Sequence, residues 1–152
     1  YDIPGQEKSE AMNTRIDYLY RDAANYKLYG HVVIPGEITE KQIQKIMKFC
    51  LPFDGETRQF IPELIGFPVL KFDLPSDDDH PCCEISPKCF SPTEEKPTIK
   101  LSAKRLVMKF HAASQTSEMQ FYREWVFTGF DPLNPPKCVD EIESEYEWEY
   151  YE

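Results

Sequence analysis

Two stretches in the first part of the chain alternate between polar and apolar residues. Residues 14–20 place isoleucine and tyrosines on one face and charged side chains on the other, and the alternation resumes over residues 26–34. A period of two over aromatic and β-branched residues is typical of strands. Residues 22–25, Asp-Ala-Ala-Asn, favour a turn because Asp and Asn side chains bond to nearby backbone. The pattern predicts a β-hairpin, whose second strand has as its apolar face Tyr26, Leu28, Val32 and Ile34.

Two amphipathic helices are predicted after hydroxyl N-caps. Thr39 and Gln42 form a capping box, and the helix that follows is expected to end before Pro52. Its apolar face holds Ile43, Ile46, Met47 and Cys50. The second helix begins after Ser102, at the end of a short strand expected at residues 98–101. Its buried stripe consists of Ala103, Leu106, Val107 and Phe110.

The middle of the chain is rich in proline. Residues 52–98 contain eight prolines, which prevents long regular elements, so we expect an ordered loop with short extended pieces at 69–72 and 82–85. Residues 119–127 fit either a strand or one face of a helix. Their aromatic and β-branched content favours the strand.

The C-terminal segment shows the sharpest alternation. Apolar side chains alternate with glutamates over residues 141–150, which predicts a strand with one apolar and one acidic face. Its acidic positions are Glu141, Glu143, Glu145, Glu147 and Glu149, and the apolar face includes Tyr146, Trp148 and Tyr150. Prolines at 132, 135 and 136 separate this strand from the rest of the chain.

The predicted fold class is α+β. A mainly antiparallel sheet begins with the hairpin, and the two capped helices pack on one of its faces. We divide the chain into a leader over residues 1–11, a single domain over 12–137, and an acidic and aromatic C-terminal strand or arm over 138–152. The leader is similar to the linker of tagged expression vectors, and an ordinary flexible N-terminus is the alternative.

The formal net charge of −10 is spread unevenly. Residues 139–152 hold seven acids and no base, and the leader contributes −2, which leaves −1 for residues 12–138. Such a segment repels nucleic acid and anionic membranes, so we expect no direct contact with either. The apolar runs are also much shorter than the roughly 20 residues of a membrane span.

The cysteines and histidines suggest one metal site. Five cysteines, an odd number, and no signal-peptide pattern indicate free thiols in the cytoplasm. The residue types that bind zinc gather at His80, Cys82, Cys83 and Cys89. Adjacent cysteines on a strand point to opposite faces, however, so buried thiols without a cofactor are the simpler interpretation. The acidic loop at residues 73–79 could likewise bind a hard cation or be simply solvated.

No enzyme motif is visible. The three histidines lie outside any recognisable nucleophile motif, and the six glycines form no phosphate-binding loop. A small enzyme with its site in residues 52–98 therefore stays only as an alternative, beside the zinc-binding protein.

The first residues of the domain resemble a known group of sequences. Residues 16–23 (IDYLYRDA), residues 33–42 (VIPGEITEKQ) and the Phe-Ile-Pro at 60–62 resemble small uncharacterised proteins of gut-type bacteria and their mobile elements. The similarity covers residues 12–112. It implies a bacterial or phage origin, a cytosolic location and a compact α+β domain, and it brings no known activity.

We therefore predict a non-enzymatic protein-interaction module. Alternate residues of a strand put a carboxylate about every 6.8 Å along the C-terminal segment, which imitates a nucleic-acid backbone. This favours an inhibitor from phage or a mobile element that engages a basic, nucleic-acid-binding partner. Alternatively, the glutamates bind the basic residues Lys104, Arg105 and Lys109 of the same chain, or the strand pairs with a second copy to form a homodimer.

Overall fold

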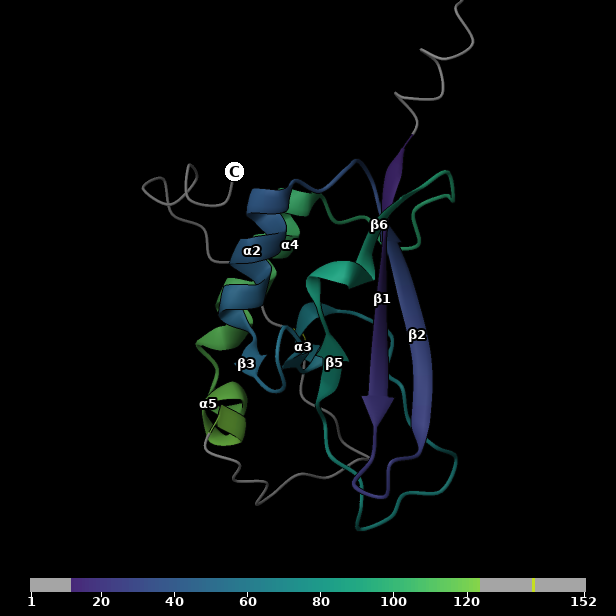
Figure 1. Ribbon diagram of the computed structural model, residues 1–152, viewed down its shortest axis with the longest axis vertical. Helices are drawn as coiled ribbons and strands as arrows, with labels where there is room; N and C mark the ends of the chain where they lie inside the picture. The colour runs from purple at the N-terminus through teal and green to yellow at the C-terminus, as the bar shows by residue number, and fades with distance from the viewer. Residues whose placement is uncertain (1–11, 124–137, 139–152) are drawn as a thin grey trace, which may run out of the picture.

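The structure, a computed structural model, describes residues 12–123 and residue 138 (Figure 1). Predictions for the leader, for residues 124–127 and for the C-terminal arm fall outside these residues. Within them, a mainly antiparallel sheet of six strands packs against helices, which confirms the α+β class. None of the described helices has the length and apolar character needed to cross a membrane.

The predicted hairpin is present. Strand β1 (Asn13–Arg21) pairs antiparallel with β2 (Lys27–Ile34) along its whole length. In the turn, the Tyr26 N–H donates to Asp22 Oδ1 at 2.8 Å, and Asn25 adopts a left-handed φ of 71°. These are the local bonds expected of Asp and Asn in a turn.

The second strand departs from the predicted alternation at its two ends. Tyr26, expected on the apolar face, is 67% exposed because it lies in the turn before the strand begins. Val33, expected on the polar face, is buried. The reason is a later segment: the Thr98 N–H donates to the Val33 carbonyl at 2.8 Å, and the Val33 N–H donates to the Thr98 hydroxyl at 2.9 Å.

Four short strands complete the sheet. The edge of β1 that faces away from β2 pairs with β5 (Cys83–Ile85) and with β6 (Phe90–Thr93), which are joined by the 3-10 helix η1 (Pro87–Cys89). The sheet then continues through β4 (Arg58–Phe60) to β3 (Leu51–Pro52), in the order β2-β1-β5-β4-β3. All the pairings are antiparallel.

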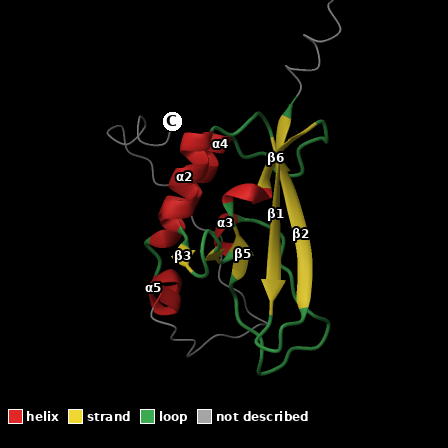
Figure 2. Ribbon diagram, in the orientation of Figure 1, coloured by secondary structure: helices red, strands yellow, loops and turns green. Residues whose placement is uncertain are grey.

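Both predicted helices have their predicted caps. Helix α2 (Glu40–Phe49) has the full capping box: the Gln42 N–H donates to the Thr39 hydroxyl at 3.1 Å, and the Thr39 N–H donates to the Gln42 side chain at 3.0 Å. Helix α4 (Ala103–Ser114) begins at Ser102, whose hydroxyl accepts from the Arg105 N–H. The two helices lie side by side on one side of the sheet (Figure 2).

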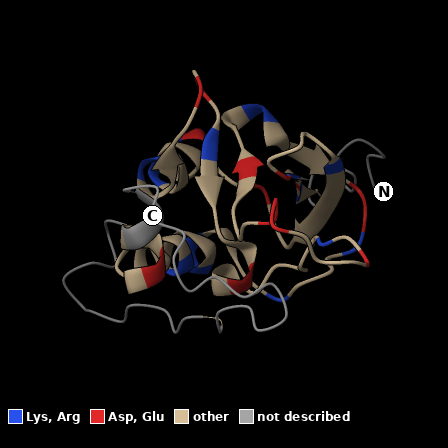
Figure 3. Cartoon of the chain, turned by 90° about the horizontal axis from the view of Figure 1, so that it is seen from below, with Lys and Arg blue, Asp and Glu red and all other residues tan. Residues whose placement is uncertain are grey.

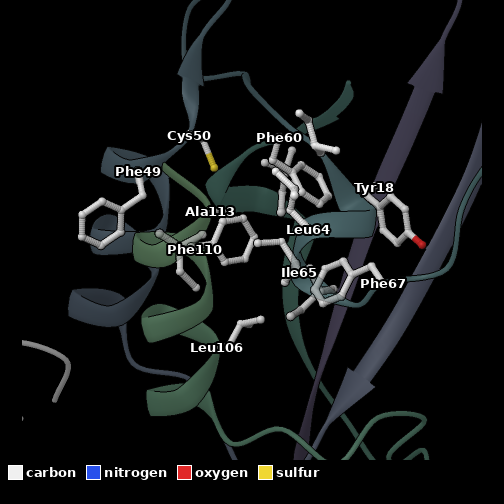
Figure 4. Packing of buried hydrophobic residues seen from close by; sticks show 14 of the residues in the cluster. Tyr18, Phe49, Cys50, Phe60, Leu64, Ile65, Phe67, Leu106, Phe110 and Ala113 are labelled. Atoms are coloured by element: carbon white, nitrogen blue, oxygen red, sulfur yellow. The ribbon is translucent and has the colours of Figure 1, made fainter. Parts of the chain in front are cut away.

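Aromatic rings join the sheet to the helices (Figure 4). Phe60 of β4 lies 5.7 Å from Tyr18 of β1, 5.9 Å from Phe67 and 5.6 Å from Phe110 of α4, measured between ring centroids. The edge-to-face geometry of the Tyr18 and Phe67 contacts is favourable for aromatic pairs. Phe67 follows the short helix α3 (Pro62–Ile65), so this cluster also holds part of the proline-rich segment in place.

Three sequence predictions are corrected by the structure. Residues 119–123, the described part of the strand expected at 119–127, belong instead to helix α5 (Ser117–Arg123). The Thr116 hydroxyl accepts from the Met119 N–H at 3.3 Å, which caps the helix, and Met119 is buried. Residues 69–72 and 98–101 form no strand either. In the latter segment, the Thr98 and Ile99 N–H groups donate to the Val33 carbonyl at the edge of the sheet.

Loss of the capping box should destabilise the domain. Thr39→Ala leaves the Gln42 N–H without its acceptor, so the free energy of unfolding should fall by about 1 kcal/mol. Thr39→Ser, which keeps the hydroxyl, is the matched control and should lie close to the parent protein. Urea unfolding followed by circular dichroism measures both. Equal stabilities of the Ala and Ser variants would show that the hydrogen bond contributes nothing.

One oxygen of the half-buried Glu63 carboxylate lacks a partner. Among the described residues, Glu63 Oε2 of α3 is the side-chain atom that is shielded from solvent without a hydrogen bond. Burial raises the pKa of Glu63 above its ordinary value of 4.5, and the hydrogen bond from its own backbone opposes this less strongly. Because the folded state binds this proton more tightly than the unfolded chain, the free energy of unfolding falls as pH rises from 4.5 through the raised pKa.

Removing this charge should stabilise the protein at neutral pH. Glu63→Gln should raise the melting temperature at pH 7 by about 2–4 °C, the equivalent of about 1 kcal/mol. Below pH 4 the carboxyl is protonated in both states, and the difference should largely disappear. Glu56→Gln, at an exposed position, is the control. Scanning calorimetry at pH 7 and at a pH below 4 measures the melting temperatures. An equal gain in melting temperature at both pH values would contradict the role of the charge.

Candidate ligand-binding cleft

A cleft of about 360 Å³ lies where the β1–β2 turn, β4, β5 and residues 76–82 meet. The β1–β2 turn lies at the lower end of the sheet in Figure 1, and Figure 3 shows the chain from below, with Asp and Glu in red. The lining residues are Arg21, Asp22, Ala23, Phe53, Gln59, Asp77, Asp78, Asp79, His80, Cys82 and Glu84.

Strand register puts one row of side chains into the cleft. Glu84 of β5 is paired with Gln59 of β4 on one side and with Leu19 of β1 on the other. Paired residues share a face of the sheet, and their neighbours Cys83 and Phe60 point into the core on the opposite face. The alternation that buries Phe60 therefore directs Gln59 and Glu84 outward.

The acidic loop is fixed by its own carboxylate. The Tyr20 hydroxyl donates to Asp79 Oδ1 at 2.6 Å, and the Ser76 N–H donates to Asp79 Oδ2 at 2.8 Å. Burial, and secondarily the bond to Asp79, raises the pKa of Tyr20, so the phenol keeps its proton and remains the donor at neutral pH. The Ala23 N–H donates to the Asp78 carbonyl at 3.0 Å, which ties the loop to the hairpin turn.

His80 anchors the other end of the loop. The Cys82 N–H donates to His80 Nδ1 at 3.2 Å, so this nitrogen is the unprotonated one in the neutral ring. The proton then lies on Nε2, which donates to the Arg21 carbonyl at 2.6 Å. Because both ring nitrogens bind backbone groups, His80 acts as a structural link and is poorly placed to serve as a catalytic base.

The cleft has a strong excess of negative charge. Five carboxylates line it beside a single guanidinium, that of Arg21. Arg21 Nε donates to Glu84 Oε2 at 2.9 Å, and Nη1 donates to Asn25 Oδ1 at 2.5 Å, so its charge is already matched. Asp77 and Asp78 are exposed on the loop, and no side-chain bond of either carboxylate occurs in the described part of the chain.

Gln59 is the unusual polar residue of the cleft. It is 6% exposed, yet its amide forms no hydrogen bond within the described residues. Glu63 Oε2 is the side-chain atom of the described residues that is shielded from solvent and has no hydrogen bond; the Gln59 amide is not in that state. The Gln59 amide therefore opens into the cleft it lines. An amide that is open to the cleft can be hydrated, so it avoids the cost of a buried polar group without a partner, but it forms no hydrogen bond with the described residues that would stabilise the fold.

The predicted zinc ligands do not converge. Cys82 and Cys83 are buried, and burial raises the pKa of both thiols, that of Cys82 to about 12. His80 binds backbone, and Cys89 Sγ lies 3.5 Å from the Ser86 hydroxyl. In residues 12–123 and 138, no three His, Cys, Asp or Glu side chains are grouped to hold a metal ion.

The predicted partner-binding residues Glu141–Glu149, Tyr146, Trp148 and Tyr150 lie outside the described residues. The residue just before this segment is placed: Cys138 Sγ lies 3.2 Å from Lys109 Nζ on α4. Binding of the glutamates to the same chain, to a second copy and to another protein all stay predictions.

Sequence reasoning found part of the cleft and missed its base. The acidic loop and His80 were identified as candidate chemistry, whereas Gln59, Arg21 and Glu84 were not. No local signal marks Gln59, because it lies between β3, which is nearby in the sequence, and β5, which follows only at Cys83–Ile85.

Comparisons with known proteins give no further lead. Neither protein-family models, nor curated proteins, nor solved structures include a match to this chain. The resemblance to small bacterial proteins therefore stays a prediction, and the function has to be argued from the cleft itself.

Proposed function

We propose that this protein is an interaction module that binds a basic partner protein through the acidic cleft. The observation that supports this most directly is the imbalance of charge: five carboxylates and one already paired guanidinium line a single cleft. A concave site of one sign attracts ligands of the opposite sign and orients them as they approach. Basic surfaces that bind nucleic acid are one class of partner with the required charge.

The division of labour among the carboxylates supports binding. Asp79 holds the loop, Asp22 holds the turn, and Glu84 pairs with Arg21. Asp78 contributes backbone groups to the loop: its N–H donates to the Ser76 hydroxyl, and its carbonyl accepts from the Ala23 N–H. Within the described residues, neither the Asp77 nor the Asp78 carboxylate forms a hydrogen bond. Their carboxylates are therefore available to a ligand, and substitution by Asn leaves the loop bonds intact.

The C-terminal glutamates provide a second acidic surface in this proposal. They begin three residues after Cys138, which lies beside α4. The experiment must therefore distinguish the cleft from the C-terminal segment.

Neutralising the two available carboxylates should weaken binding of a basic ligand. The probe is a labelled Gly-Ser peptide with alternating arginines and lysines, measured by fluorescence anisotropy at about 150 mM salt, where long-range effects are screened. Asp77→Asn with Asp78→Asn should lower the affinity about fivefold, at roughly 0.5 kcal/mol for each exposed charge. Glu37→Gln with Glu94→Gln removes the same charge at exposed positions outside the cleft and should change affinity by less than about twofold.

A third variant tests the C-terminal segment in the full chain. It replaces Glu141, Glu143, Glu145, Glu147 and Glu149 with Gln. A loss with this variant alone would move the binding site to the segment and overturn the role of the cleft. Equal losses in the cleft and control variants would reduce the interaction to net charge, and absence of binding by the parent protein would overturn the proposed function.

A further inference from the structure

The position of Gln59 suggests which basic side chain the cleft accepts. Gln59 lies in the middle of the row across the sheet, paired with Leu51 on one side and Glu84 on the other. Leu51 is 2% exposed, so the neighbouring site accommodates an apolar residue. An amide at a buried strand position, open to a cleft and without an internal partner, is suited to a ligand and not to the fold.

The remaining hydrogen-bond acceptors of the cleft come from different elements. Gln59 offers an amide oxygen at the sheet, while Asp77 and Asp78 offer carboxylates from the loop. A ligand that donates hydrogen bonds to all of these acceptors at once needs several donors at fixed angles to one another. A planar guanidinium has five N–H donors in a rigid fork, whereas an ammonium is a compact, strongly hydrated point charge.

The wall of the cleft already contains an example of this recognition. The Arg21 guanidinium donates to a carboxylate oxygen of Glu84 and to an amide oxygen of Asn25. One carboxylate and one amide thus satisfy a guanidinium in this part of the molecule. Gln59 with Asp77 and Asp78 presents the same two kinds of acceptor, and neither aspartate forms an ion pair within the described residues.

We propose that the cleft is a receptor for an arginine side chain, in which the buried Gln59 amide oxygen accepts a guanidinium N–H and Asp77 and Asp78 neutralise its charge. This inference rests on the proposed function and makes it specific: the basic partner presents an arginine. The contribution of Gln59 is discrimination, since its buried acceptor is satisfied by a directed donor. The carboxylates contribute attraction that lysine would share.

The test uses two small probes and the full chain. The ¹⁵N-labelled protein is titrated with N-acetyl-arginine methylamide and, separately, with N-acetyl-lysine methylamide. The side-chain amide resonance of Gln59 is assigned by its absence in Gln59→Met. Arginine should shift this resonance and the backbone resonances of residues 77–80, and it should bind at least about fivefold more tightly than lysine.

A substitution separates recognition from stability. Gln59→Met keeps the length of the side chain and removes the unpaired amide, so it should melt no lower than the parent protein. It should bind the arginine probe about tenfold more weakly, the loss expected for one hydrogen bond to a charged group. Gln44→Met, at an exposed position on α2, is the control and should bind as the parent does.

The outcomes separate the two proposals. Equal binding of arginine and lysine, unchanged in Gln59→Met, would overturn the arginine receptor and leave an acidic cleft that binds basic ligands. A clear drop in the melting temperature of Gln59→Met would make Gln59 a structural residue and also overturn it. If neither probe shifts resonances of the cleft, both the receptor and the proposed function fail.

Discussion

The burial of Phe60 is the constraint on which both the core and the cleft depend. Its ring contacts Tyr18, Phe67 and Phe110, so it joins strand β1, the proline-rich segment and helix α4. Side chains alternate along a strand, and Gln59 must therefore face the other side of the sheet. The same alternation on β5 buries Cys83 and turns Glu84 outward. The base of the cleft thus follows directly from the packing of the core.

The rim of the cleft has a different origin. Residues 76–82 contain turns and a bend but no strand or helix. Hydrogen bonds of side chains hold the shape of this loop. Tyr20 binds Asp79, and His80 links the Arg21 carbonyl to the Cys82 N–H, so the end of β1 acts as the template for the loop. Charged groups that fix the loop are distinct from those that remain for a ligand. A rigid base with a loop held by polar bonds is a common arrangement for binding sites.

Local signals explain what the sequence could reveal. The hairpin and both capped helices follow from alternation, turn residues and caps that act within a few positions, and the structure confirms them. Residues 119–123 of the strand expected at 119–127 were wrongly predicted because aromatic content favoured a strand, whereas the Thr116 cap and the burial of Met119 select the helix. Gln59 could not have been identified, because the pairing of β4 with β5, which places Gln59 beside Glu84, joins segments that are distant in the sequence.

The pairing of β1 also has a consequence for how the chain reaches its folded state. One edge of β1 is satisfied by β2, its immediate neighbour in sequence, but the other waits for β5 and β6, where Leu19 meets Glu84 about 65 residues later. During synthesis the hairpin and α2 emerge first and leave a row of unpaired backbone groups on a long strand. An open edge of this kind is a template for pairing with other chains. We therefore expect the late closure of this edge to slow folding and the emerging chain to be prone to aggregation before that closure.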